Sequence, residues 1–201
     1  EINDSCHSFR FNPKAKISVF SFHPVKHITT GEGGMLLTNN KRYAKLAKDY
    51  RDHCRLTDRL GYNYRITDFQ CALGLSQLKR LDWAIRERRS IARYYNTVLE
   101  KYVELPPYHP DHTYHIYPVR FKNREQRDKF WVLCKEKGIG VQLHYSPIHL
   151  LPFYQKLGYK KGDFPITEDY AERTLSIPLH PYLNNEQIYY IGETVKEFVC
   201  G

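Results

Sequence analysis

The sequence predicts an α/β protein built in two parts. In the first part, an aromatic and β-branched stretch at residues 19–22 precedes a proline- and glycine-rich segment and the apolar run at residues 35–38, which is typical of two strands joined by a loop. A helical pattern then extends from Thr67 toward Leu99, and beyond it strand and helix signals alternate. The 201 residues, 41% of them hydrophobic, are enough to bury one substantial core or two small ones.

The elements of the first part follow from side-chain spacing. Residues 40–52 are expected to form a helix after the strand at residues 35–38. Thr67 is suited to cap a second helix, with Asp68 in its first turn. Apolar residues then recur at helical spacing: Phe69, Leu73, Leu78, Leu81 and Ile85. This pattern predicts one long helix, which ends before the proline pair at residues 106–107.

The second part is expected to alternate strands and helices. Strands are predicted at residues 115–121 and 141–145, on either side of a helix at residues 124–137 that Gly138 ends. Pro118 makes the first of these an edge strand or a bulged one. Three further elements complete the chain: a helix at residues 167–174, an extended run at 175–179 and an amphipathic helix at 185–199.

Residues 21–34, which read SFHPVKHITTGEGG, are the most informative segment. They place Lys26 just past a strand end, between Ser21 and a glycine-rich turn. A lysine whose pKa is lowered by burial or by nearby positive charge can form a Schiff base with a carbonyl. The hydroxyl of Ser21 and the backbone N–H groups of the turn are suited to bind a phosphate. A lysine beside glycines is by itself more often a surface residue, so the assignment depends on the whole segment.

This segment resembles the cofactor-lysine motif of the DegT/StrS sugar aminotransferases, pyridoxal-phosphate (PLP) enzymes of the aspartate-aminotransferase fold, or PLP fold type I. Four other stretches resemble the family in the family's order: residues 61–68, 72–78, 141–147 and 176–179. The resemblance is strongest to the branch that aminates C4, rather than C3, of nucleotide-linked 4-keto-6-deoxy sugars. It implies that residues 1–86 are a partial large, cofactor-binding domain with the start of the interdomain helix. Residues 87–201 would then be the small C-terminal α+β domain.

The resemblance also implies roles for individual residues. Lys26 would hold PLP as a Schiff base and, once freed by the incoming amine, carry a proton as acid and base. Asp4 would pair with the pyridine nitrogen and keep it protonated, which makes the ring an electron sink. His7 would lie beside the ring, and Ser21 would bind the cofactor phosphate. Asn63 would reach the phosphate held by a neighbouring subunit, so a homodimer with shared active sites is expected.

The same resemblance indicates the reaction and its substrates. His144 and Tyr145 are expected to contact a nucleotide sugar, with glutamate as the amino donor and modified surface polysaccharides as the destination. Relatives that remove a hydroxyl from a sugar have histidine in place of the lysine, so Lys26 favours transamination over dehydration. His27 is no substitute for that histidine, because adjacent residues of an extended segment point to opposite faces.

Each of these residues also has a purely structural explanation. Asp4 and His7 could be solvated side chains, and Ser21 could satisfy a backbone group at a strand end. Asn63 could be a turn residue that tolerates left-handed geometry, and the two small-domain residues could be ordinary turn partners. The order and spacing of the motifs favour the functional assignment of the whole set over these alternatives.

Composition argues against several other classes of function. The net charge of +9 invites a nucleic-acid interpretation, but the basic residues are spread out and form no aromatic-interleaved stripe. A basic surface also suits a substrate that carries a diphosphate. Neither a membrane-spanning run nor a leader is recognisable. The five cysteines have no metal-binding spacing, so a cytoplasmic protein without a metal site is expected.

The chain is expected to be the C-terminal portion of such an enzyme, because Glu1 already falls within the middle of the family's large domain. A sheet that lacks the preceding strands should expose apolar faces and long edges. The alternative is a truncated, non-catalytic partner subunit of the same fold. Two departures from the family pattern are Cys54, where glycine is usual, and the short link at residues 55–60, which affects the geometry of the loop that the family exchanges between subunits.

Overall fold

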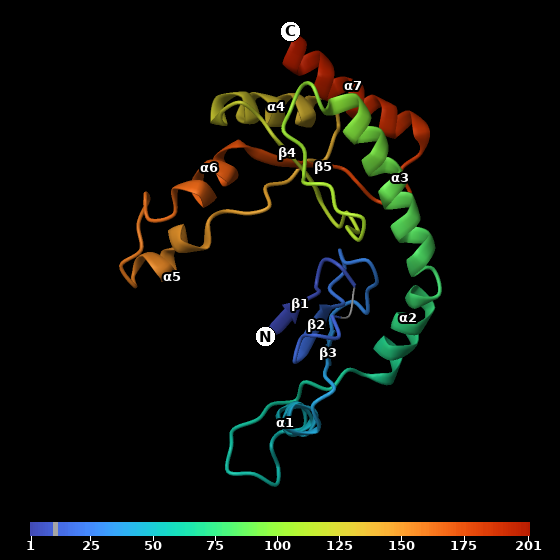
Figure 1. The fold of residues 1–201 in the computed structure, drawn as a ribbon, viewed down its shortest axis with the longest axis vertical. Coiled ribbons are helices and arrows are strands. Elements are labelled where there is room, and N and C mark those ends of the chain that lie inside the picture. Colours follow the sequence, from blue (N-terminus) through green and yellow to red (C-terminus); the bar gives the residue numbers. More distant parts are fainter. Residues whose placement is uncertain (10–11) are drawn as a thin grey trace. The chain divides into compact units, whose positions relative to one another are not determined.

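The computed structural model describes residues 1–9 and 12–201, which form two compact units (Figure 1). Unit 1 contains residues 1–86 and the short segment 111–115, and unit 2 contains residues 87–110 and 116–201. The chain therefore enters unit 2 after Arg86, returns to unit 1 for five residues, and then stays in unit 2.

A three-stranded sheet with the order β1-β2-β3 organises unit 1 (Figure 1). Strand β1 (Ile2–Asp4) is parallel to β2 (Ile17–Ser21), and β3 (Gly34–Leu37) is antiparallel to β2. Asp4 is opposite Val19 in this register. Because parallel strands end at the same edge of a sheet, Asp4 and the loop that follows β2 emerge together.

The helices of unit 1 begin where their capping residues predict. Helix α1 (Lys41–Arg51) starts after Asn40, whose side chain accepts hydrogen bonds from the first-turn backbone. Helix α2 (Asp68–Leu78) starts after Thr67, which forms a reciprocal capping box with Gln70. Each cap satisfies backbone N–H groups that a helix start leaves unpaired. The predicted helix at residues 40–52 and the N-cap at Thr67 are thus confirmed.

The single long helix predicted from Thr67 to Leu99 is wrong, because the structure has two. Helix α2 ends at Leu78 and α3 (Leu81–Leu99) follows. The N–H of Arg80 bonds to the carbonyl of Gln77, three residues back rather than four, at 3.2 Å. This tightened turn interrupts the helical hydrogen-bond series at a position where apolar spacing continues without a break.

The core of unit 1 lies between β2, the loop after it and the start of α3. Phe20, Phe22, Ile28 and Leu81 are buried together. In contrast, apolar side chains of the sheet and of α2 are exposed: Ile2, Met35, Leu36, Leu75 and Leu78. An apolar cavity of about 360 Å³ is lined by residues of β3 and α2, among them Met35, Leu75 and Leu78. The expectation of exposed apolar faces is therefore confirmed.

Unit 2 is built on two antiparallel strands, β4 (Tyr117–Arg120) and β5 (Thr174–Ile177). Its helices are α4 (Arg124–Glu136), the 3₁₀ turn η1 (Ile148–Leu150), α5 (Pro152–Gln155), α6 (Pro165–Arg173) and α7 (Asn185–Cys200). Tyr95, Tyr117, Phe121, Phe130 and Leu175 are almost completely buried in its core. The helices near residues 124–137, 167–174 and 185–199 agree with the prediction.

The strand predicted at residues 141–145 does not form, and β5 takes the place beside β4. Only Gln142 pairs in that region, through two backbone hydrogen bonds with Ser176 of 2.8 and 3.1 Å. His144 instead uses its ring to bond the side chain of Ser176. Alternating apolar and polar residues are typical of a strand. Here the pairing stops after one residue, because the chain turns toward Pro147 and η1.

None of the helices in the described ranges is long and apolar enough to cross a membrane.

Candidate functional site

Asp4 stands at the carboxyl end of β1, and its side chain is held by the backbone. Its Oδ1 accepts a hydrogen bond of 2.9 Å from the N–H of Cys6. The pKa of Asp4 is lowered, first by hydrogen bonds from the Cys6 side chain and backbone and then by the positive charges of His7 and Lys26. The structure thus brings Asp4, His7 and Lys26 within electrostatic reach of one another and keeps the carboxylate ionised.

Lys26 lies in the loop that leaves β2, as the sequence predicted. Two backbone hydrogen bonds close the base of this loop, from Phe22 to Gly33 at 2.9 Å and from Thr30 to Phe22 at 3.0 Å. The N–H of Lys26 bonds to the carbonyl of His23 at 2.9 Å, which forms a tight turn. The Lys26 side chain is half-buried, and within the described residues its Nζ makes no hydrogen bond or ion pair. Its amine is therefore available for chemistry.

The glycine-rich end of the loop rests on α2. The side chain of Gln70 donates a hydrogen bond of 3.0 Å to the carbonyl of Glu32. Gly33 has φ +149°, and a Cβ there would lie 2.5 Å from Thr30 Oγ1. A Cβ on Gly74 of α2 would lie 3.0 Å from Thr30 Cγ2. Glycine at both positions permits this close approach, which fixes the turn beside the lysine loop.

Ser21 is the last residue of β2, and its side chain makes a hydrogen bond to the backbone two residues further on. Its Oγ accepts a hydrogen bond of 3.3 Å from the N–H of His23. This is the structural role that serine often has at a strand end. The hydroxyl keeps its proton and its other lone pair for a further contact, so the local bond leaves phosphate binding as a proposal.

Asn63 is not brought to the edge that holds Asp4 and Lys26. Its Oδ1 accepts a hydrogen bond of 3.0 Å from Arg65 Nε, and its backbone forms an isolated bridge with Asp52. The turn-like explanation therefore describes Asn63 within this chain. A contact with a second subunit stays a proposal.

Sequence reasoning missed the segment at residues 111–115, which lies in unit 1. Thr113 bonds both His7 and His27, and the ring of His115 lies 4.2 Å from that of His7 between centroids. No periodic signal marks this segment, because it is a loop. The only clue in the sequence is its density of histidine, which local pattern rules do not interpret.

His144 and Tyr145 belong to unit 2. His144 Nδ1 is 2.9 Å from Ser176 Oγ, which is an ordinary structural contact. Tyr145 is 61% exposed and lines a small pocket of about 190 Å³ with Arg124 and Arg127. Arg127 is itself buried. Tyr145 is therefore placed to contact a ligand from solvent, whereas His144 is oriented by Ser176.

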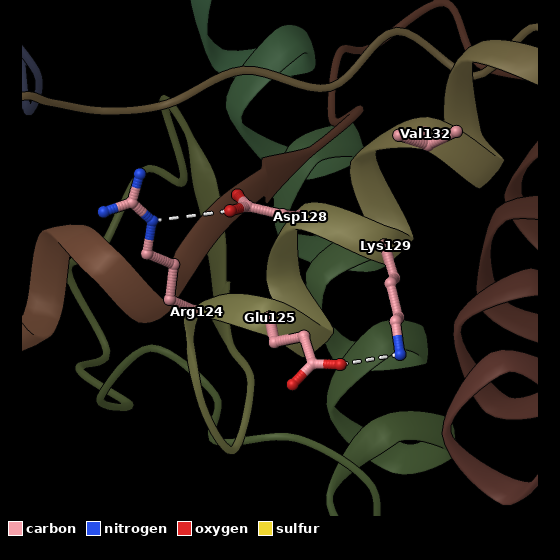
Figure 2. Close-up of a pocket in the computed structure, with 5 residues that line it drawn as sticks. All are labelled: Arg124, Glu125, Asp128, Lys129 and Val132. Atoms are coloured by element: carbon pink, nitrogen blue, oxygen red, sulfur yellow. Dashed lines mark hydrogen bonds and ion pairs between the residues drawn. The ribbon is translucent and has the colours of Figure 1, made fainter.

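Two basic residues of α4, Arg124 and Lys129, are paired with carboxylates of the same helix. Figure 2 shows a shallow hollow on this helix where Arg124 bonds Asp128 at 3.4 Å and Lys129 bonds Glu125 at 2.8 Å. Both pairs are one helical turn apart, at i and i+4, and exposed. Because each of these cations faces a carboxylate, Arg124 and Lys129 do not form the row of unpaired positive charges that would bind a nucleic acid.

Comparisons with known proteins identify the class. The model of the DegT/DnrJ/EryC1/StrS aminotransferase family matches residues 4–196. The chain is 34% identical to the UDP-4-amino-4,6-dideoxy-N-acetyl-beta-L-altrosamine transaminase of Campylobacter jejuni, over 100% of this chain and 60% of that protein.

Solved structures agree with the sequence comparison. Helicobacter pylori PseC, an aminotransferase involved in the biosynthesis of pseudoaminic acid, superposes with a TM-score of 0.89 at 30% identity, over 98% of this chain and 59% of that one. The PLP form of Spr1654 from Streptococcus pneumoniae superposes with a TM-score of 0.89 at 26% identity, over 98% and 57%.

The fold is therefore that of the PLP-type aminotransferases. The chain belongs to the DegT/DnrJ/EryC1/StrS aminotransferase family. It spans about 60% of the length of the relatives it matches.

Proposed function

We propose that this chain carries the lysine-bearing part of a PLP-dependent aminotransferase, which moves an amino group from glutamate to the C4 keto group of a nucleotide-linked 4-keto-6-deoxy sugar. One observation carries the proposal: an available lysine amine and an ionised aspartate share the carboxyl edge of β1 and β2. Family membership and the similarity to a UDP-sugar transaminase support the substrate class.

The chemistry of these side chains fits PLP. When bound, PLP supplies an aldehyde that receives the amino group and a ring that withdraws electrons from the reacting carbon. Asp4, whose carboxylate stays ionised, would hold the proton of the pyridine nitrogen. The hydroxyl of Ser21 and the N–H groups of the glycine turn would bind the phosphate.

Lys26 would do the covalent and proton-transfer work. Its amine would hold the aldehyde of PLP and, when free, would take a proton from the reacting carbon as a base and return it as an acid. His7 would lie against the ring, close to Asp4.

The remaining assignments extend beyond unit 1. His144 and Tyr145 would contact the nucleotide sugar, and Asn63 would contact the cofactor phosphate of a second copy in a homodimer. The part of the relatives' length that this chain does not match would cover the exposed apolar side chains of β3 and α2. A cytoplasmic location is proposed with the same substrates, because nucleotide sugars are polar metabolites.

The test is reductive trapping. The purified protein is incubated with PLP, reduced with borohydride and digested for peptide mapping. An adduct concentrated on Lys26 is expected, and Lys26→Ala should remove it. Lys16→Ala is the matched control, since Lys16 is exposed just before the opposite end of β2. Label spread evenly over the surface lysines, or retained in full by Lys26→Ala, would refute the proposal.

A further inference from the structure

Three hydrogen bonds join the lysine loop, the segment that follows β1 and residues 111–115 of unit 1 to one another. His27 Nε2 lies 2.8 Å from Thr113 Oγ1 and 3.2 Å from the carbonyl oxygen of His7. Thr113 Oγ1 donates to the same carbonyl at 2.6 Å. Thr113 is 6% exposed, so this cluster is shielded from water.

The directions of these bonds determine the state of the imidazole. The Thr113 hydroxyl has one proton, which it gives to the His7 carbonyl, so its oxygen must accept from His27. His27 therefore carries its proton on Nε2. The ring also donates toward the His7 carbonyl, which has no proton to give in return. Both contacts require the same tautomer.

His27 is next to Lys26, and its contacts reach beyond the turn. The side-chain hydrogen bond of His23, which accepts from the Val25 N–H, is by contrast local. The base of the loop is closed by backbone bonds and by the buried Phe22 and Ile28. The tip that carries Lys26 is thus held to other segments through the His27 ring.

We propose that Thr113 and His27 are positioning residues for Lys26: the Thr113 hydroxyl fixes the His27 ring, and the ring fixes the turn from which the amine extends. The proposal rests on the proposed role of Lys26. It also gives a function to residues 111–115, which belong to unit 1 although the residues before and after them belong to unit 2. Their contribution is to hold the Lys26 side chain within electrostatic reach of Asp4.

The tautomer is measured first, in the unmodified protein. Nitrogen-15 NMR of labelled histidine distinguishes an Nε2-protonated ring from an Nδ1-protonated one. His27 is expected in the Nε2–H form. A neutral His27 ring with its proton on Nδ1 would overturn the proposal without any variant.

Position is then measured by trace acetylation, which reports how accessible each lysine amine is and needs no cofactor. Thr113→Val keeps the shape of the side chain and removes the hydroxyl. It should raise the acetylation rate of Lys26 relative to Lys16 by roughly three- to tenfold, the range that loss of one buried hydrogen bond allows. Thr113→Ser should restore the original ratio. Thr97→Val, which removes a hydroxyl bonded to Arg93 on α3, is the matched control and should leave it unchanged.

Trapping with limiting PLP and borohydride separates this inference from the proposed function. Thr113→Val should reduce the Lys26 adduct by a similar factor, while Thr113→Ser should retain it. If the unmodified protein gives no Lys26 adduct but the acetylation ratio still responds to Thr113, the proposed function fails and the positioning stands. If the acetylation ratio is the same in all variants, the positioning role is wrong.

Discussion

The carboxylate of Glu168 lies 2.8 Å from Nε2 of His149, and both side chains are buried. The same carboxylate accepts hydrogen bonds from the N–H of Gly162, at 2.8 and 3.0 Å, and from that of Phe164 at 3.4 Å. One side chain of α6 therefore holds both the 3₁₀ turn η1 and the loop before α6. The Glu168 carboxylate therefore joins the two sides of the segment that contains α5.

This contact predicts acid sensitivity in unit 2. The hydrogen bond from His149 and then those from Gly162 and Phe164 lower the pKa of Glu168 below its ordinary 4.5. Because the unfolded state takes up the proton at a higher pH than the folded state, the stabilisation is complete above 4.5 and is lost as pH falls through the lower folded value. Hydrogen exchange should show protection of the Gly162 amide falling below about pH 4.5.

Glu168→Gln tests the same point by removing the charge. The Gly162 amide should already be less protected at neutral pH in this variant, and its protection factor should vary little between pH 3 and 7. Glu100→Gln is the control, because Glu100 is exposed and makes no ion pair within the described residues. Equal pH dependence in Glu168→Gln and the unmodified protein would contradict the prediction.

The structure shows what cysteine at position 54 requires of the backbone. The family usually has glycine here, and the structure gives Cys54 a φ of +52° with only 3% of the residue exposed. Since a side chain costs about 1–2 kcal/mol in this left-handed region, Cys54→Gly should be more stable than Cys54→Ala by about 1 kcal/mol. Urea unfolding measures the difference.

The control for Cys54 is a second buried cysteine with ordinary helical geometry. Cys134 is fully buried in α4. In a helix interior, alanine is favoured over glycine by about 1 kcal/mol, so Cys134→Ala should be more stable than Cys134→Gly. Opposite orders at the two sites are expected. The same order at both would show that left-handed strain at Cys54 is negligible.

Local sequence rules predicted most of the elements but not the contacts between distant segments. Thr67 and its capping partner Gln70 are three residues apart, a spacing that local rules for helix starts cover. His27 and Thr113 are 86 residues apart, and no local rule connects them. Because the apolar spacing continues past Arg80, it predicted one helix. The break between α2 and α3 is visible only in the backbone hydrogen bonds. The lysine loop was predicted because the resemblance supplied its meaning; composition alone favoured a surface lysine.

Gly61 is predicted to be required by the backbone of the loop after α1. A Cβ there would lie 2.5 Å from the carbonyl carbon of His53 and 2.6 Å from the nitrogen of Cys54. The methyl group of Gly61→Ala must separate the backbone at residues 53–54 from that at residues 61–62 and weaken the hydrogen bond from the His53 N–H to the Tyr62 carbonyl. The free energy of unfolding should fall by about 1–3 kcal/mol.

Each unit has one tryptophan, which lets the effect of Gly61→Ala be localised. Trp83 reports on unit 1 and Trp131 on unit 2, so urea unfolding is followed in a Trp131→Phe background. Gly140→Ala in unit 2 is the control, followed by Trp131 fluorescence in a Trp83→Phe background; because no atom lies within 4 Å of the added Cβ, it should shift stability by no more than about 0.5 kcal/mol. A Gly61→Ala midpoint equal to that of its background would refute the steric argument.

Tyr95 is predicted to stabilise unit 2 through its hydroxyl. Its side chain is fully buried, burial raises the pKa of its phenol, and the hydroxyl donates a hydrogen bond of 3.0 Å to the carbonyl of Pro178. Tyr95→Phe leaves that carbonyl without its donor, so the free energy of unfolding should fall by about 1 kcal/mol. The adjacent Tyr94→Phe should cost less than about 0.5 kcal/mol, because within the described residues the Tyr94 hydroxyl makes no hydrogen bond. Unfolding is followed by Trp131 fluorescence in a Trp83→Phe background, and equal losses in the two variants would show that the Tyr95 hydroxyl contributes nothing beyond its ring.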